Sequence, residues 1–87
     1  MKSVYLISID YTDPQTGEMQ YNEIRCAFTS FAAAQRFLDE IAKDWSIDNP
    51  DQYLTSKTRM TAQIKSSNPQ RFDDIFISIV EVPLYDF

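Results

Sequence analysis

Apolar and polar residues alternate at the start of the chain with the period of a β-strand. Within residues 3–12, one parity carries side chains such as Tyr5 and Ile9, and the other begins with Val4 and Leu6. Period-2 alternation of aromatic and branched residues predicts a strand. Both parities begin apolar, so both faces of this strand carry apolar side chains at its start.

A turn and a second strand follow. Residues 13–17 contain a proline and the chain's single glycine, which is typical of a hairpin turn. The return strand covers residues 19–28 and places Ile24 and Cys26 on one face. Its first residues are out of phase with that face, so the pattern predicts either a β-bulge near Asn22 or an aromatic side chain on the outer face.

The strongest pattern in the chain is an apolar stripe with helical spacing. Thr29 or Ser30 caps the predicted helix, and the opposite side of the helix is charged and solvated. The stripe consists of Phe31, Ala34, Leu38, Ile41 and Trp45, with Phe37 alongside.

The remaining chain predicts one short helix and two strands. Asn49 followed by proline combines an N-cap with a residue favoured at the first helical position, so residues 50–56 are predicted to form a short second helix. Residues 59–65 alternate as a one-sided strand, and residues 74–84 carry apolar side chains on both faces.

These patterns predict an α+β domain that spans residues 1–87. The two-sided strands, 3–12 and 74–84, belong at the centre of a sheet, and the one-sided strands, 19–28 and 59–65, belong at its edges. We therefore expect a four-stranded, mainly antiparallel sheet in the order 2-1-4-3, with one main helix packed on one face.

A single helix leaves the other face of such a sheet uncovered. The uncovered apolar set is one of two, either Val4, Leu6, Phe76 and Val80, or Tyr5, Ile7, Ile75 and Ile77. An exposed apolar face is typical of an interface, and we predict a homodimer that packs sheet against sheet through the first set. In the alternative, residues 46–58 fold across that face.

Charge narrows the class of partner. The net charge of −5 argues against direct binding to nucleic acid, which requires basic residues to neutralise phosphates, and favours a basic protein as partner. Acids and aromatic residues gather after the helix stripe, in the composition of a binding hot spot with a charged rim. The predicted partner-binding residues are Asp39, Glu40, Asp44, Trp45, Asp48, Asp51 and Tyr53. In the alternative, Trp45 completes the core stripe and the acids are only solvated.

The chain offers little catalytic chemistry. It contains no histidine, so triads that depend on an imidazole base are excluded, and Cys26 is predicted to be a small core residue. Asp73 and Asp74 fit a solvated turn, one glycine is too few for a phosphate-binding loop, and the acids lack calcium-loop spacing. We expect no catalytic residue, no cofactor and no metal. Without a membrane-length apolar run or a signal segment, the expected location is cytoplasmic and off the membrane.

The hairpin VYLISIDYTDPQTGE and the capped helix FTSFAAAQRFLDEIAK resemble segments of small bacteriophage and mobile-element proteins of the strand-strand-helix-strand-strand type. That group includes anti-CRISPR and other anti-defence inhibitors as well as immunity proteins. The resemblance covers residues 1–45 and implies no residue roles.

Three functions follow as hypotheses. The first is a non-enzymatic protein-binding module, an inhibitor or immunity-type protein that masks a basic surface of a partner such as a nucleic-acid-binding defence enzyme. The second is a small homo-oligomeric structural or regulatory protein of phage or plasmid origin. The third is an enzyme that uses only carboxylates and tyrosines.

Overall fold

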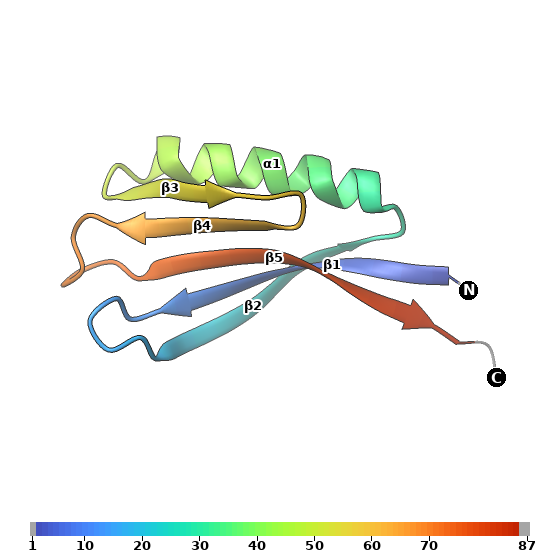
Figure 1. Ribbon diagram of the computed structural model, residues 1–87, viewed down its shortest axis with the longest axis horizontal. Helices are drawn as coiled ribbons and strands as arrows, with labels where there is room; N and C mark the ends of the chain where they lie inside the picture. Colours follow the sequence, from blue (N-terminus) through green and yellow to red (C-terminus); the bar gives the residue numbers. More distant parts are fainter. Residues whose placement is uncertain (1, 86–87) are drawn as a thin grey trace.

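The computed structural model describes residues 2–85 as one helix packed on one five-stranded sheet (Figure 1). All neighbouring strands are antiparallel, in the order β2-β1-β5-β4-β3. The elements in chain order are β1 (Lys2–Thr12), β2 (Met19–Phe28), α1 (Phe31–Asp48), β3 (Gln52–Lys57), β4 (Thr61–Ser66) and β5 (Asp74–Leu84).

The predicted four-stranded sheet in the order 2-1-4-3 is wrong, because β3 adds a fifth strand at one edge. The predicted short helix over residues 50–56 is wrong for the same reason. Asn49 does not cap a new helix; its backbone N–H and its side-chain Nδ2 both donate to the carbonyl of Trp45 and so close α1. The chain then turns directly into β3.

The hairpin between β3 and β4 is closed by Thr58. Its Oγ1 accepts hydrogen bonds from the backbone N–H groups of Met60 and Thr61, and its own N–H donates to the Thr61 carbonyl. Hydroxyl groups at turns satisfy backbone donors in this way. The turn at Thr58 and the pairing with β4 therefore hold residues 52–57 as a strand.

The central pair of strands, β1 and β5, forms the longest ladder. Its register runs without a shift from Lys2 opposite Leu84 to Thr12 opposite Asp74. At the Lys2–Leu84 end the two strands extend beyond the rest of the sheet (Figure 1). The described chain is therefore elongated, with extents of 48 × 24 × 17 Å.

A bulge in β2 changes which residues face the helix. Ile7 lies opposite Cys26 but Ser8 lies opposite Ile24, so Arg25 is the extra residue on β2. The prediction that Ile24 and Cys26 share a face is wrong, since a bulge reverses the parity of the strand. A second register shift, between Tyr21 and Met19, leaves Gln20 as an extra residue, so a bulge does lie near the predicted position but not at Asn22 itself.

The core lies between α1 and one face of the sheet. Ser30 caps the helix, with its side-chain oxygen accepting from the backbone N–H of Ala33 at 3.3 Å. Branched residues from the three central strands meet the helix stripe, as the alternation predicts. The fully buried large side chains are Ile7, Ile9, Leu38, Ile64 and Ile77.

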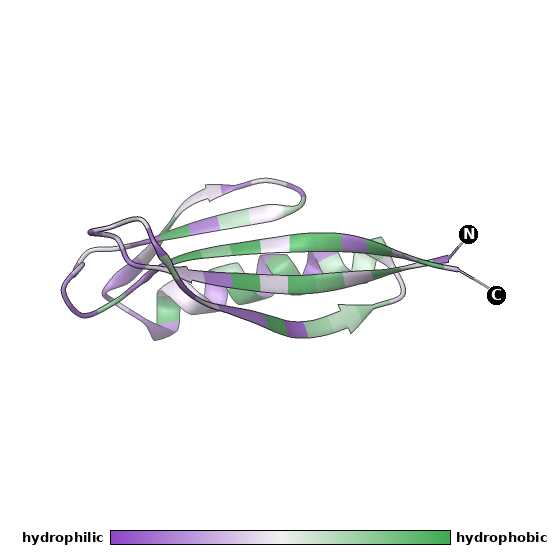
Figure 2. Ribbon diagram, turned by 90° about the horizontal axis from the view of Figure 1, so that it is seen from below, coloured by the Kyte–Doolittle hydropathy of each residue, from purple (hydrophilic) through white to green (hydrophobic). Residues whose placement is uncertain are grey.

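The opposite face of the sheet has no cover within residues 2–85. The only helix there lies on the other side, as the view from below shows (Figure 2). Residues 46–58, the predicted alternative cover, form the end of α1 and the edge strand β3. In the described part of the chain, this face of the sheet therefore has no covering element.

Candidate functional site

The uncovered face of the sheet, here called the open face, carries the even-numbered residues of β1 and β5. Ile7, Ile77 and the other buried apolar residues of these strands face α1, so Val4, Leu6, Phe76 and Val80 lie on the open face. This is the predicted dimer set. Neighbouring strands and the ends of β1 and β5 add apolar residues to it, namely Met19, Ile24, Ala27, Val82 and Leu84.

Several open-face side chains are exposed to an extent that is unusual for large apolar residues in a sheet. Ile24 is 52% exposed, Val80 42% and Val82 36%. They lie around Leu6, which pairs across the sheet with Val80 on one side and Ala27 on the other. Contiguous apolar surface of this kind is typical of a protein interface.

Polar residues occupy the other end of the open face. Ser8 pairs with Ser78, and beyond them Asn22 donates from Nδ2 to Ser8 and to Asp10. Further along, Lys65 and Asp74 form an ion pair at 3.4 Å. The apolar end of the face around Leu6 contains none of these charges.

A second surface is a groove between α1 and β2, here called the helix-side groove. It has a volume of about 490 Å³. Its apolar floor is formed by Phe37, Ile41 and Trp45, which are partly buried against the core. The remaining lining residues are Arg25, Glu40, Asp44, Asp48 and Asn49.

Three of these carboxylates, Glu40, Asp44 and Asp48, are exposed and form a row along α1, here called the acidic row. Residues four apart lie one above the other on a helix, so each acid has a like charge as its neighbour. None of the ion pairs found among residues 2–85 involves a member of this row. The only base that lines the groove, Arg25, binds the Glu23 carboxylate at 2.8 Å.

Trp45 has a structural partner as well as a place in the groove. Its indole Nε1 donates to Oε1 of Gln52 at 2.9 Å, and its ring centroid lies 6.2 Å from that of Tyr11. The residue completes the helix stripe, as the alternative interpretation predicted. Trp45 nevertheless also lines the groove.

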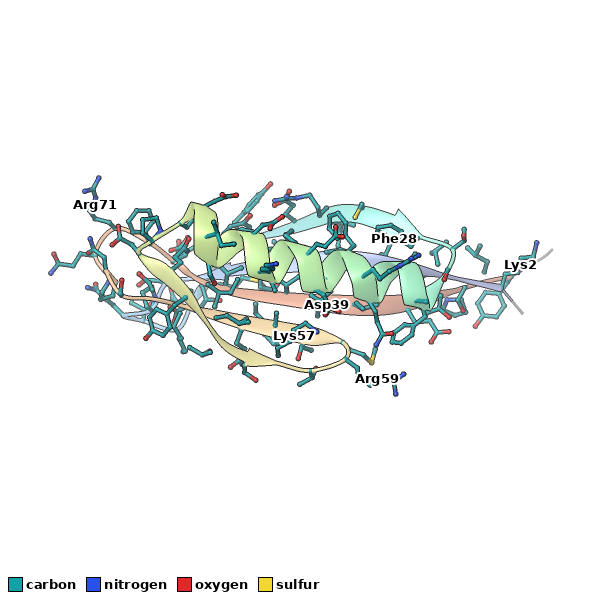
Figure 3. All side chains as sticks on the ribbon, turned by 90° about the horizontal axis from the view of Figure 1, so that it is seen from above. Lys2, Phe28, Asp39, Lys57, Arg59 and Arg71 are labelled. Carbon is teal, nitrogen blue, oxygen red and sulfur yellow. The ribbon has the colours of Figure 1, made fainter. Side chains whose placement is uncertain are left out.

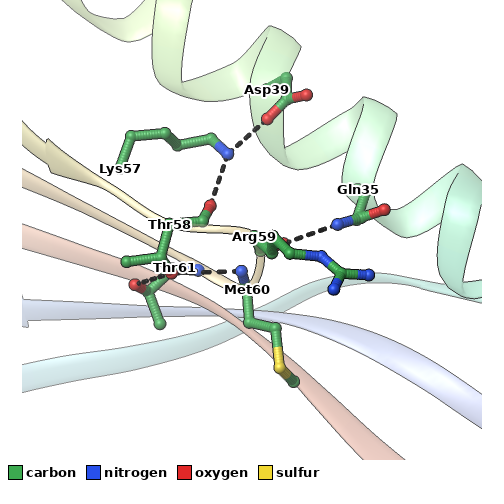
Figure 4. A network of polar contacts seen from close by, with 7 residues as sticks. All are labelled: Gln35, Asp39, Lys57, Thr58, Arg59, Met60 and Thr61. Carbon is green, nitrogen blue, oxygen red and sulfur yellow. Dashed lines mark hydrogen bonds and ion pairs between the residues drawn. The ribbon is translucent and has the colours of Figure 1, made fainter.

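The other predicted partner-binding residues do not join this groove. Asp39 lies on the opposite flank of α1 and forms an ion pair with Lys57 (Figures 3 and 4). Asp51 lies in the turn before β3, where its carbonyl accepts from the N–H of Ser67. Tyr53 is 50% exposed and pairs with Lys65, on the side of the sheet away from α1.

The polar contacts around Asp39 connect the β3–β4 hairpin to the helix (Figure 4). Lys57 donates to the Thr58 carbonyl at 2.6 Å as well as pairing with Asp39, and Gln35 donates from Nε2 to the Arg59 carbonyl at 3.3 Å. These contacts hold the hairpin in place. The Asp39 carboxylate is therefore engaged within the fold.

The titratable groups with perturbed pKa values belong to a small cluster on β1 and β2. Hydrogen bonds from Arg25 and from the Tyr11 hydroxyl lower the pKa of Glu23. Burial, with the neighbouring Glu23 carboxylate, raises the pKa of Tyr11. Burial also raises the pKa of the Cys26 thiol, which packs against the core.

Within residues 2–85, no three Cys, Asp or Glu side chains come close enough together to hold a metal ion. No helix in the same range is long and apolar enough to cross a membrane.

Comparison of the chain with protein-family models, with curated proteins and with solved structures gives no match. The resemblance to small phage and mobile-element proteins therefore stays a prediction.

Sequence reasoning missed Phe37, Ile41 and Arg25 as groove residues. The helical stripe already contained the first two, but nothing in the stripe indicates that α1 leaves them partly uncovered. Arg25 reaches the groove only because the bulge in β2 brings it to the helix side.

Proposed function

We propose that this protein is a non-enzymatic interaction module and that a second copy of the chain binds its open face. The observation that carries the proposal is the uncovered apolar surface around Leu6, which includes Ile24 and Val80. The product is a homodimer in which two sheets pack face to face and the two helices lie outside.

The size of the open face supports this assignment. With strands about 4.8 Å apart and about 3.3 Å per residue, the five strands present a projected area of roughly 700 Å². Stable interfaces commonly bury about 800 Å² from each partner. Two sheets packed about 10 Å apart bury such an area, with the apolar residues around Leu6 in contact at one end and polar residues at the other.

The distribution of charge permits a second copy on the open face. Two chains of net charge −5 repel each other, so they associate best through a surface that keeps their carboxylates apart. The acidic row lies on the helix side, whereas the open face around Leu6 is uncharged. Face-to-face packing therefore separates the acidic rows of the two copies.

The test is the oligomeric state of matched variants, measured by sedimentation equilibrium or light scattering. Leu6→Lys places a charge in the centre of the apolar patch, and we expect a folded monomer. Ile47→Lys makes the same change on α1, where Ile47 is 67% exposed, and should stay dimeric. A wild-type chain that is monomeric at about 100 µM, well above the dissociation constants usual for stable dimers, would contradict the proposal. Equal behaviour of the two variants would contradict it as well.

A further inference from the structure

We infer that the helix-side groove binds a basic segment of another protein, with apolar side chains of that segment on the groove floor and its cations along the acidic row. This inference goes beyond the homodimer, because the groove lies on the α1 side of the sheet and stays accessible when two open faces pack together.

The first argument is that the acidic row is unfavourable for the isolated helix. Asp44 follows Glu40 by four residues and precedes Asp48 by four, and like charges at this spacing destabilise a helix. The last turns of a helix also carry a partial negative charge, which favours bases over acids. The last turn of α1 contains no base.

The second argument is that the fold does not neutralise this row. In the described part of the chain, Asp39 has Lys57 and Glu23 has Arg25, yet the acidic row has no ion-pair partner. Local choices that oppose the stability of an element, without compensation inside the fold, tend to occur at functional sites. A cationic partner would relieve both the repulsion and the dipole effect.

The third argument is the shape and chemistry of the groove. Its floor offers Phe37, Ile41 and Trp45, while the acids stand at its rim. Arginine and lysine combine an apolar stem with a charged end, so their side chains match a groove of this construction. Arginine also stacks on tryptophan rings. The partner class is therefore a segment that mixes arginine or lysine with apolar residues.

A residue of the groove floor can report directly on peptide binding. Trp45 is the only tryptophan in the chain and lines the groove, so a bound peptide should change its fluorescence emission directly. The probe is a short peptide of alternating arginine pairs and leucine pairs, titrated into the full chain. A peptide with glutamate in place of arginine is the control and should leave the emission unchanged.

Two double variants separate a specific site from general attraction to an acidic protein. Asp44→Asn with Asp48→Asn removes two charges from the row, and we expect the dissociation constant for the arginine peptide to rise about tenfold. Glu18→Gln with Asp73→Asn removes the same net charge from turns outside the groove, and should change it by no more than about twofold. Binding should also weaken steeply between about 50 and 500 mM salt.

Two results would overturn the inference. One is an unchanged Trp45 emission at saturating arginine peptide; the other is an equal loss of affinity in the two double variants, which indicates attraction to net charge alone. The titration is repeated on Leu6→Lys. If the arginine peptide binds to that monomer as it does to the wild type, the groove does not depend on the homodimer. A failure of the groove inference can then be told apart from a failure of the homodimer proposal.

Discussion

The indole Nε1 of Trp45 donates a hydrogen bond to Oε1 of Gln52, which ties the last turn of α1 to the first residue of β3. Gln52 is only 6% exposed and uses its Nε2 as well, donating to the carbonyl of Asp73 at 2.8 Å. One buried amide thus connects the helix, the edge strand and the segment that enters β5.

Replacing this amide with an apolar side chain should destabilise the protein. Gln52→Leu leaves the Trp45 N–H and the Asp73 carbonyl without their partner, and each unsatisfied buried group costs about 1–3 kcal/mol. We expect the free energy of unfolding in urea to fall by about 2–4 kcal/mol. Gln70→Leu, in the exposed turn before β5, is the matched control and should change it by less than about 0.5 kcal/mol. Equal effects of the two substitutions would show that the Gln52 bonds do not matter.

Truncation of the central helix residue tests the position of the core. Leu38 is fully buried between α1 and the sheet, so Leu38→Ala removes apolar contacts and leaves a cavity, which costs about 2–5 kcal/mol. Leu54→Ala makes the same change on the edge strand β3, outside the open face, at a residue that is 39% exposed, and should cost less than about 1 kcal/mol. Thermal unfolding of both variants measures the difference. A smaller effect at Leu38 than at Leu54 would be incompatible with the described core.

The acidic row should make the unbound protein less stable than its neutral variant. Asp44→Asn with Asp48→Asn removes like-charge repulsion and an unfavourable interaction with the helix dipole, so stability should rise by about 0.5–1.5 kcal/mol at low salt. The gain should shrink in about 0.5 M salt, where charges on the surface are screened. The matched pair Glu18→Gln with Asp73→Asn lacks the helix contribution. Urea titrations at two ionic strengths would refute the idea if the acidic-row variant were the less stable one.

The Tyr11–Glu23–Arg25 cluster should make stability depend on pH at both extremes. The pKa of Glu23 is lowered in the fold, so its contribution is present above the ordinary value of 4.5 and is lost as pH falls through the lower folded value. The pKa of Tyr11 is raised, so its contribution is present below 10.0 and is lost as pH rises through the higher folded value.

Two substitutions, Glu23→Gln and Tyr11→Phe, test the loss of stability at low pH (the acid limb) and at high pH (the alkaline limb). With Glu23→Gln, the deficit in unfolding free energy relative to the wild type should be largest near neutral pH and should vanish once the pH has fallen below the lowered folded pKa of Glu23. Tyr11→Phe should flatten the alkaline limb, and it should weaken the acid limb without removing it, because the bond from Arg25 to Glu23 remains. Glu18→Gln, in the turn between β1 and β2, serves as the control for loss of a carboxylate. If the loss of stability at low pH were unchanged in Glu23→Gln, that loss would arise from other groups.

The wrong prediction of a helix over residues 50–56, where the structure has β3, shows the limit of local sequence patterns. Asn49 and Pro50 carry helix-start chemistry, and residues 50–56 lack clean alternation, so the local signal favours a helix. The ladder with β4 and the buried bonds of Gln52 decide otherwise. Both depend on residues distant in the sequence, and tertiary contacts routinely override weak local propensity.

The prediction of the partner-binding site was limited for the same reason, because it rested on local sequence alone. The sequence analysis predicted one site that includes Asp39, Asp48 and Tyr53, because these acids and aromatic residues lie near one another in the sequence. Asp39 lies on the other flank of α1 from the groove, and Tyr53 faces away from the helix. Helical position alone separates the first from the acidic row, but the face of Tyr53 follows only from the pairing of β3.

By itself, the sequence determined the strands around Ile9 and Ile77 and the helix around Leu38, because period-2 and helical alternation bury apolar residues whatever their distant partners are. It also determined, through the missing histidine, which catalytic chemistry the chain lacks. The tertiary structure decided that β3 joins the sheet, that the bulge at Arg25 turns Ile24 to the open face, and that no segment among residues 2–85 covers that face. Strand pairing and bulges depend on contacts between distant segments, so only the folded chain fixes which apolar surface stays exposed.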